Sequence, residues 1–145
     1  MSDRAGWTAE GRPLLAGSAR GRLLVLDEPL SLWGGLDPRD GRLIDGHHPQ
    51  HGASLRDRLV ALPAGRGSSS SSSVLAEALR AGTGPRALLL RHADGILLVG
   101  ALVARELYAV ECPIVVLAAA DYRRLRTDDE ALIERGGRIS VRRLT

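Results

Sequence analysis

Leu59-Val60-Ala61-Leu62-Pro63-Ala64-Gly65-Arg66-Gly67 runs directly into six serines, Ser68 to Ser73, and then into Val74-Leu75-Ala76-Glu77-Ala78-Leu79. The apolar run 59–62 is typical of a buried strand, and the apolar residues after the serines repeat at helical spacing until Gly82. The sequence therefore predicts a strand over 59–62 and a helix over 70–81, joined by a turn of glycine and serine. Such a turn directs backbone N–H groups and hydroxyls at one point, where the helix N-terminus adds partial positive charge. Such a turn suits the binding of an anion, or a serine whose hydroxyl must lose its proton.

The serine turn differs from two well-known catalytic patterns. No Gly-Lys-Ser/Thr ending is present, which excludes a P-loop, and no glycine follows the serines as it does in a nucleophile elbow. The alternative is that these polar residues only precede and cap a helix and have no chemical role. The residues by themselves leave both interpretations open.

The composition points to one domain with an aliphatic core. The chain has 145 residues, of which 44% are hydrophobic, with two Trp, two Tyr and no Phe. All 20 basic residues are Arg, which excludes a lysine Schiff base or a P-loop lysine in this chain. The net charge is only +3, and aromatic residues for base stacking are scarce, so nucleic-acid binding is disfavoured.

The sequence shows no signal for export or membrane insertion. Its beginning lacks the apolar core of a signal peptide, and no run approaches the roughly 20 apolar residues of a membrane span. We therefore expect a cytoplasmic protein that binds no membrane.

Short apolar strands alternate with helices in the second half. Beyond the elements named above, strands are predicted over 22–26, 43–44, 87–90, 114–117 and 138–144, and helices over 96–108 and near 128–135. The first half is rich in strand and turn signals. This order predicts an α/β fold in which a β-rich first half is layered on a mainly parallel α/β second half. Residues 1–13 are predicted to be a mobile N-terminal segment, and 14–145 a single domain.

Residues that could bind a metal are few. His48 and His51 have the spacing of metal ligands, but the loop that carries them holds Pro49 and Gly52. No acidic or thiolate residue lies at a sequence spacing typical of a further ligand. A polar loop is the preferred interpretation. The single cysteine, Cys112, precedes a buried-looking strand and is expected to be a small core residue. We therefore expect no metal site on this chain.

Several stretches resemble the small subunit of the aconitase X family. Residues 29–38, Pro-Leu-Ser-Leu-Trp-Gly-Gly-Leu-Asp-Pro, are similar to the family's Pro-Leu-Ser-Phe-Trp-Gly-Gly-Val-Asp-Pro, and the match continues at 62–72, Leu-Pro-Ala-Gly-Arg-Gly followed by serines. Ile44-Asp45, His48-Pro49 and the segments 77–80, 100–108 and 113–117 fit as well. The resemblance covers about residues 15 to 120, with small departures at Leu32, Leu36 and Gln50.

The resemblance implies a swivelling β/β/α domain that serves as the small subunit of a hydro-lyase. It implies that a large subunit forms a heterodimer with this chain and holds an iron–sulfur or iron centre through its own cysteines, while this chain binds no cofactor. It also implies that the serine directly after Arg-Gly, here Ser68, is the general base.

The chemistry of the serine turn agrees with such a role. Dehydration of a hydroxy acid requires removal of a weakly acidic Cα proton and departure of hydroxide, which iron can bind. A serine alkoxide can take the proton only if its negative charge is stabilised by nearby donors and the helix N-terminus. We therefore expect Ser68 to be catalytic. The residues expected to bind substrate or support the oxyanion are Arg66, Gly67, Ser69 and Ser70.

Four further residues are expected at the subunit interface or behind the site. Gly34 and Gly35 allow close backbone approach, Asp37 flanks a turn, and Trp33 is an apolar anchor of the kind enriched at interfaces. The alternative is that Trp33 fills the core of its own domain. We expect the loop 33–37 and Ser68 to share one cleft. The roles of Ser71 to Ser73 and of the loop His47–His51 stay open.

Three functions remain in view. The polyserine form resembles bacterial members that convert cis-3-hydroxy-L-proline to Δ1-pyrroline-2-carboxylate. The second hypothesis is mevalonate 5-phosphate dehydratase, the archaeal activity of the same family. The third, from another class, is a non-catalytic swivel module that binds an anion or a partner. The sequence leaves the substrate open, because much of the pocket is expected on the large subunit.

Overall fold

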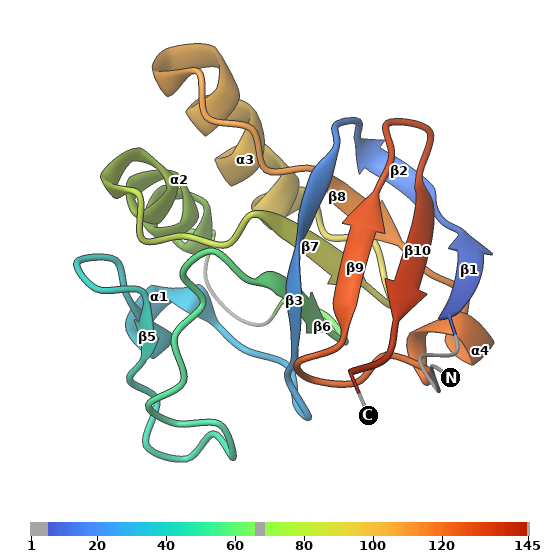
Figure 1. Ribbon diagram of the computed structural model, residues 1–145. Helices are drawn as coiled ribbons and strands as arrows, with labels where there is room; N and C mark the ends of the chain where they lie inside the picture. Colours follow the sequence, from blue (N-terminus) through green and yellow to red (C-terminus); the bar gives the residue numbers. More distant parts are fainter. Residues whose placement is uncertain (1–5, 66–68, 145) are drawn as a thin grey trace.

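A row of parallel strands forms the centre of the fold in the computed structural model, which describes residues 6–65 and 69–144 (Figure 1). In order across the sheet, these strands are β3 (Ala19–Val25), β6 (Leu59–Leu62), β7 (Ala87–Leu90) and β8 (Ile114–Val116). The helices that connect β6 to β7 and β7 to β8 are α2 (Ser71–Ala81) and α3 (Gly95–Tyr108). The predictions for β6, β7, β8, α2 and α3 are confirmed to within one residue at each end.

Local chemistry fixes where α2 ends and where α3 begins. Gly82 follows α2 with a φ of 78°, the left-handed conformation that glycine adopts at helix ends. Asp94 precedes α3, and its carboxylate accepts a hydrogen bond from the N–H of Leu97 at 2.9 Å, which caps the helix. Among the described residues, no helix combines the length and the apolar character needed to cross a membrane.

A second, antiparallel layer lies against the opposite face of the parallel strands (Figure 1). Starting from β3, its strands are β9 (Glu130–Ile133), β10 (Arg138–Arg142) and β1 (Gly6–Glu10). β3 belongs to both layers, because residues 19–22 pair with β9 and residues 23–25 with β6. At the far edge, β2 (Arg12–Leu15) pairs with β8. Since only Gly11 separates β1 from β2, the two ends of the strand order are joined by the chain itself.

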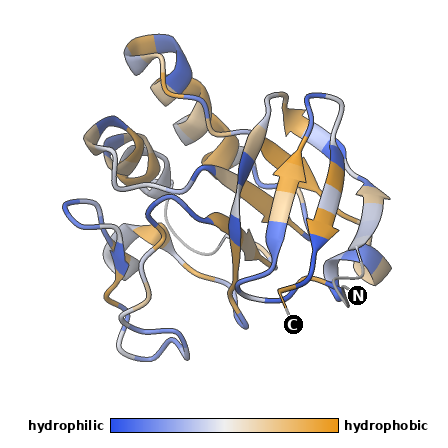
Figure 2. Ribbon diagram, in the orientation of Figure 1, coloured by the Kyte–Doolittle hydropathy of each residue, from blue (hydrophilic) through white to orange (hydrophobic). Residues whose placement is uncertain are grey.

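Alternation along the parallel strands produces two cores. Side chains that face α2 and α3 include Leu24, Val60, Leu62, Leu88 and Leu90. Side chains that face the antiparallel layer include Leu23, Leu59, Ala61, Leu89 and Val115. Because β6, β7 and β8 are covered on both faces, they are apolar at every position (Figure 2). The three layers are thus β, β and α, as the predicted fold class requires.

Two predictions about the antiparallel layer are wrong. The segment near 128–135, predicted as a short helix, contains β9, in which Ala131 and Ile133 are buried while Glu130 and Leu132 face outward. Pairing with β3 and β10 overrides the helix propensity of this stretch. Residues 6–13, expected to be mobile, form β1 and the start of β2. The antiparallel layer therefore draws its strands from both ends of the chain and not from the first half alone.

The connection from β3 to β6 forms a small subdomain beside α2 (Figure 1). It contains α1 (Leu32–Gly35), whose inner residues Trp33 and Gly34 are not helical, and the short hairpin of β4 (Leu36–Asp37) and β5 (Arg42–Leu43). A short helix, α4 (Ala119–Tyr122), follows β8 on the way to the antiparallel layer. The turn signals predicted between residues 29 and 45 are confirmed.

Candidate functional site

The candidate site lies at the carboxyl ends of β6 and β7, where α2 and α3 begin. In parallel α/β sheets this edge is the usual place for ligands. Three of the residues predicted there, Arg66, Gly67 and Ser68, lie outside the described residues. Gly65 and Ser69 mark the two ends of the turn that the structure describes.

Gly65 lies tightly between two other segments. It forms a parallel bridge with Leu30, which brings the beginning of the small subdomain to the end of β6. A Cβ atom on Gly65 would lie 2.3 Å from Oδ2 of Asp94 and 3.6 Å from Cδ1 of Leu97. The other oxygen of Asp94 caps α3, so this carboxylate is held in place. The close approach of Asp94 requires glycine at position 65.

Hydroxyl groups gather at the N-terminus of α2. Ser69 and Ser70 are exposed, and Ser72 donates a hydrogen bond from its Oγ to the carbonyl of Ser69 at 2.9 Å. The first turn of α2 carries no acidic residue. The partial positive charge of this helix end is therefore not offset by an acidic side chain in that turn.

Trp33 sits at the corner of a type II turn. Its φ and ψ are −70° and 116°, and those of Gly34 are 81° and −15°, a conformation that glycine adopts at no steric cost. The side chain of Trp33 is 59% exposed, so the alternative in which it fills the core of its domain is wrong. The backbone N–H of Trp33 donates to Oγ of Ser71 at 3.1 Å. This bond fastens the Trp33 turn to the first turn of α2.

Gly35 and Asp37 hold the remainder of this loop. Gly35 is buried, and a Cβ atom on it would lie 3.0 Å from Cδ1 of Leu30. The carboxylate of Asp37 accepts hydrogen bonds from the side chain of Arg39, at 3.2 Å from its Nε, and from its backbone N–H at 2.9 Å. These bonds hold the pKa of Asp37 below its ordinary value. Asp37 therefore stabilises the turn between β4 and β5 as an anion.

Two residues important for this geometry, Ser71 and Asp94, had no role assigned from sequence. Ser71 is buried on the same face of α2 as Leu75, four residues later, so helical periodicity alone separates it from the exposed Ser70 and Ser73. Asp94 stands before an apolar helical run and is a typical N-cap. Its contact with Gly65 depends on two neighbouring strands and has no local signal.

The histidine loop is held by a buried imidazole. His48 is 5% exposed, and its Nδ1 accepts a hydrogen bond from the N–H of Gln50 at 3.0 Å. Its Nε2 therefore carries the proton and donates to the carbonyl of Glu28 at 3.1 Å. Nδ1 thus holds the loop together internally, and Nε2 ties it to the segment that follows β3.

The described residues fit a metal poorly. No three His, Cys, Asp or Glu side chains among residues 6–65 and 69–144 come together as a metal site. Cys112 is fully enclosed in the core, and burial raises the pKa of its thiol to about 12. That the iron centre belongs to a partner remains a prediction.

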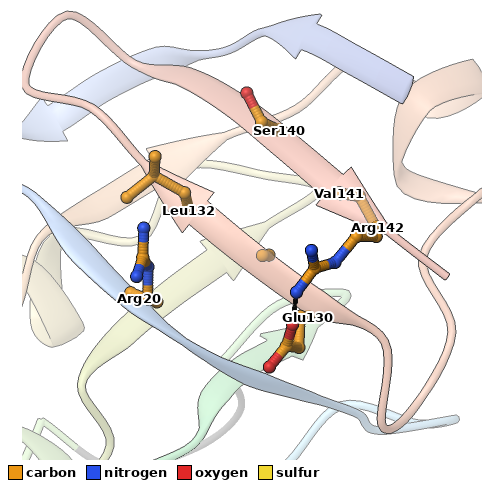
Figure 3. Close-up of a pocket in the computed structure, with 7 residues that line it drawn as sticks. Arg20, Glu130, Leu132, Ser140, Val141 and Arg142 are labelled. Atoms are coloured by element: carbon orange, nitrogen blue, oxygen red, sulfur yellow. Dashed lines mark hydrogen bonds and ion pairs between the residues drawn. The ribbon is translucent and has the colours of Figure 1, made fainter. Parts of the chain in front are cut away.

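A hollow of about 390 Å³ lies away from this site, on the outer face of the antiparallel layer (Figure 3). Arg20, Leu132, Ser140 and Arg142 line it, and Arg142 pairs with Glu130. The hydrogen bond from Arg142 holds the pKa of Glu130 below its ordinary value. The hollow is broad and open and holds no pair of groups placed for acid–base chemistry, so the serine turn remains the better candidate.

The comparisons with known proteins identify the family. A family model described as the aconitase X swivel domain matches residues 8–141. This chain belongs to the aconitase X swivel-domain family. The resemblance drawn from residues 29–38 and 62–72 is thereby confirmed.

Relatives of this swivel domain are dehydratases. The chain is 52% identical over 106 residues to the cis-3-hydroxy-L-proline dehydratase of Pseudomonas aeruginosa, a match that covers 73% of this chain and 18% of that protein. It is 41% identical over 93 residues to the phosphomevalonate dehydratase small subunit of Methanothermobacter thermautotrophicus, covering 64% of this chain and 71% of that subunit. The matched region spans about a fifth of the length of the hydroxyproline dehydratases.

A solved structure has the same fold. The crystal structure of Thermococcus kodakaraensis aconitase X in its holo form superposes with a TM-score of 0.82 at 26% identity. The match covers 92% of this chain and 97% of the solved one. The swivel-domain architecture therefore extends over nearly the whole described chain.

Proposed function

We propose that this chain is the small subunit of an aconitase X type hydro-lyase and supplies Ser68 as the general base. The observation that carries the proposal is the bond from Trp33 to Ser71, together with the bridge between Leu30 and Gly65. These contacts bring both stretches that resemble the family, 29–38 and 62–72, to one edge of the sheet. They lie there beside the N-terminus of a helix without acidic residues in its first turn.

The residues of this chain are suited to a proton transfer. In the sequence, position 68 comes three residues before α2, and a helix N-terminus favours negative charge on a base. Ser69 and Ser70 are exposed at the same place, and serine hydroxyls can donate hydrogen bonds to a carboxylate of the substrate. The iron centre expected on the large subunit would supply a Lewis acid for the leaving hydroxyl.

The substrate that we propose is cis-3-hydroxy-L-proline. The base removes the proton from Cα, the hydroxyl leaves from the neighbouring carbon, and the resulting enamine tautomerises to Δ1-pyrroline-2-carboxylate. The 52% identity to a hydroxyproline dehydratase, against 41% to a phosphomevalonate dehydratase small subunit, favours this substrate. The second candidate is mevalonate 5-phosphate, since that small subunit matches over 71% of its own length.

The test is dehydratase activity of the chain co-expressed with an aconitase X large subunit, assayed on both substrates. We expect turnover of cis-3-hydroxy-L-proline, and a loss of at least about 1000-fold in kcat for Ser68→Ala, equivalent to about 4 kcal/mol. The matched control is Ser140→Ala, which removes a hydroxyl from the outer face of the antiparallel layer and should leave kcat within about threefold.

Three outcomes separate the hypotheses. Retention of more than about a tenth of the wild-type kcat by Ser68→Ala, a loss of under about 1.4 kcal/mol, excludes Ser68 as the base. Turnover of mevalonate 5-phosphate alone selects the second substrate. Assembly of the pair without turnover of either substrate favours the third possibility, a swivel module that binds an anion or a partner without catalysis.

A further inference from the structure

The outer face of α3 carries an apolar stripe. Val99, Val103 and Leu107 follow one another at intervals of four residues and are 50%, 36% and 69% exposed. The opposite face of the helix, with Leu97, Gly100 and Ala104, is buried against α2 and the sheet. A helix that covers a sheet is normally polar on its outer side, and Figure 2 shows α3 as hydrophobic along most of its length. We call Val99, Val103 and Leu107 the α3 stripe.

A groove connects the α3 stripe to the candidate site. It has a volume of about 210 Å³ and is lined by Ser72, Ser73, Ala76, Glu77, Val103 and Tyr108. Ser72 and Ser73 belong to the first turn of α2, directly after Ser71, which holds the Trp33 turn. One surface therefore runs from Trp33 across the start of α2 to the α3 stripe.

We propose that the α3 stripe and this groove are the docking surface of the large subunit, an inference that rests on the proposed function. A base that acts on a substrate held by another subunit must lie at the edge of the contact between the two, and the groove begins at Ser72 and Ser73, in the first turn of the helix that follows the serine turn. The matched regions cover 18% and 20% of two hydroxyproline dehydratases, so about four-fifths of each relative lies beyond this domain. We infer that the counterpart of this larger part, the large subunit, buries the apolar surface that is continuous with the site.

The test is the affinity of the purified full chain for an aconitase X large subunit, measured by titration. The variant Val99→Glu/Leu107→Glu places two charges on the exposed stripe, and we expect it to raise Kd by about 30-fold or more, the effect of losing an interface hot spot. The matched control is Leu132→Glu, which places a charge on the outer face of the antiparallel layer (Figure 3) and should change Kd by less than threefold. Far-UV circular dichroism verifies that each variant is folded.

The outcomes distinguish this proposal from the proposed function. A Kd for Val99→Glu/Leu107→Glu within threefold of wild type overturns the docking surface, even if the complex is an active dehydratase. A wild-type chain that forms a homodimer, which the same double variant dissociates while large-subunit binding persists, also overturns it. Conversely, a complex that the double variant disrupts but that dehydrates neither substrate supports the docking surface and contradicts the proposed function.

Discussion

Gly65→Ala is the most informative single change at the candidate site. The added methyl group would lie 2.3 Å from Oδ2 of Asp94 and 3.1 Å from its Cγ, both well inside van der Waals contact. The backbone of Gly65 lies outside the positive-φ region, so alanine can adopt its conformation. The clash with Asp94 is therefore the dominant effect of the substitution.

The magnitude follows from the two ways in which Asp94 can respond. If its side chain rotates away, α3 loses the cap on the N–H of Leu97, which costs about 0.5–2 kcal/mol. If it stays, the overpacking costs about 1–3 kcal/mol. Both routes destabilise the fold by roughly 1–2 kcal/mol. In an Asp94→Ala background the cap is already absent and the space is free. Gly65→Ala should then be neutral, or stabilising by about 0.4–1 kcal/mol because it restricts the unfolded chain.

Urea unfolding of four proteins measures this coupling: wild type, Gly65→Ala, Asp94→Ala and the double variant. We expect an interaction free energy of about 2 kcal/mol that favours the double variant over the sum of the single changes. Gly95→Ala is the control, because a Cβ there meets no atom within 4 Å. Equal destabilisation by Gly65→Ala with and without the Asp94 carboxylate would refute the reasoning.

Three further predictions concern the surrounding fold. Gly100→Ala should destabilise the protein by about 1–3 kcal/mol in thermal unfolding. The Cβ of alanine would lie 2.7 Å from the carbonyl oxygen of Ser72 and force α2 and α3 apart. An unchanged Tm would contradict this. His48→Ala should cost about 1–3 kcal/mol in urea unfolding, since it removes a buried side chain together with the two hydrogen bonds that hold the loop. The unfolded thiol of Cys112 ionises near pH 9 and the folded one near about 12, so the unfolded state loses its proton first. The free energy of unfolding should therefore fall as pH rises from 9 towards 12, less steeply in Cys112→Ala.

The parallel half of the fold was predictable because its signals are local. Strands 59–62 and 87–90 are covered on both faces, so their apolar character needs no knowledge of partners. Gly82 and Asp94 end and begin their helices through their own backbone and side chain. Each of these features acts within a few residues of sequence.

Of the antiparallel layer, the sequence predicted β10 but missed β1 and β9, because those two strands depend on distant partners. Residues 128–135 hold good helix formers, and only pairing with β3 and β10 makes part of them a strand. Trp7 and Ala9 do alternate with polar neighbours, a weak strand signal, but their partners lie at the opposite end of the chain. The bond from Trp33 to Ser71 likewise joins residues 38 positions apart. The sequence therefore predicted the turn and the helix but not the contact between them.

The pairing of Gly6 with Arg142 has a consequence for how this domain is carried by longer proteins. The first and last strands of the domain lie side by side in the β-only layer, on the opposite side of the parallel strands from α2 and α3 (Figure 1). A polypeptide joined to either of these strands would therefore begin at the β-only layer and not at the helical face. Evolution can encode the domain as a separate chain or append it to a larger enzyme without altering the face that it presents. Splitting or fusing the gene then changes only the effective concentration of one part near the other, which the linker sets.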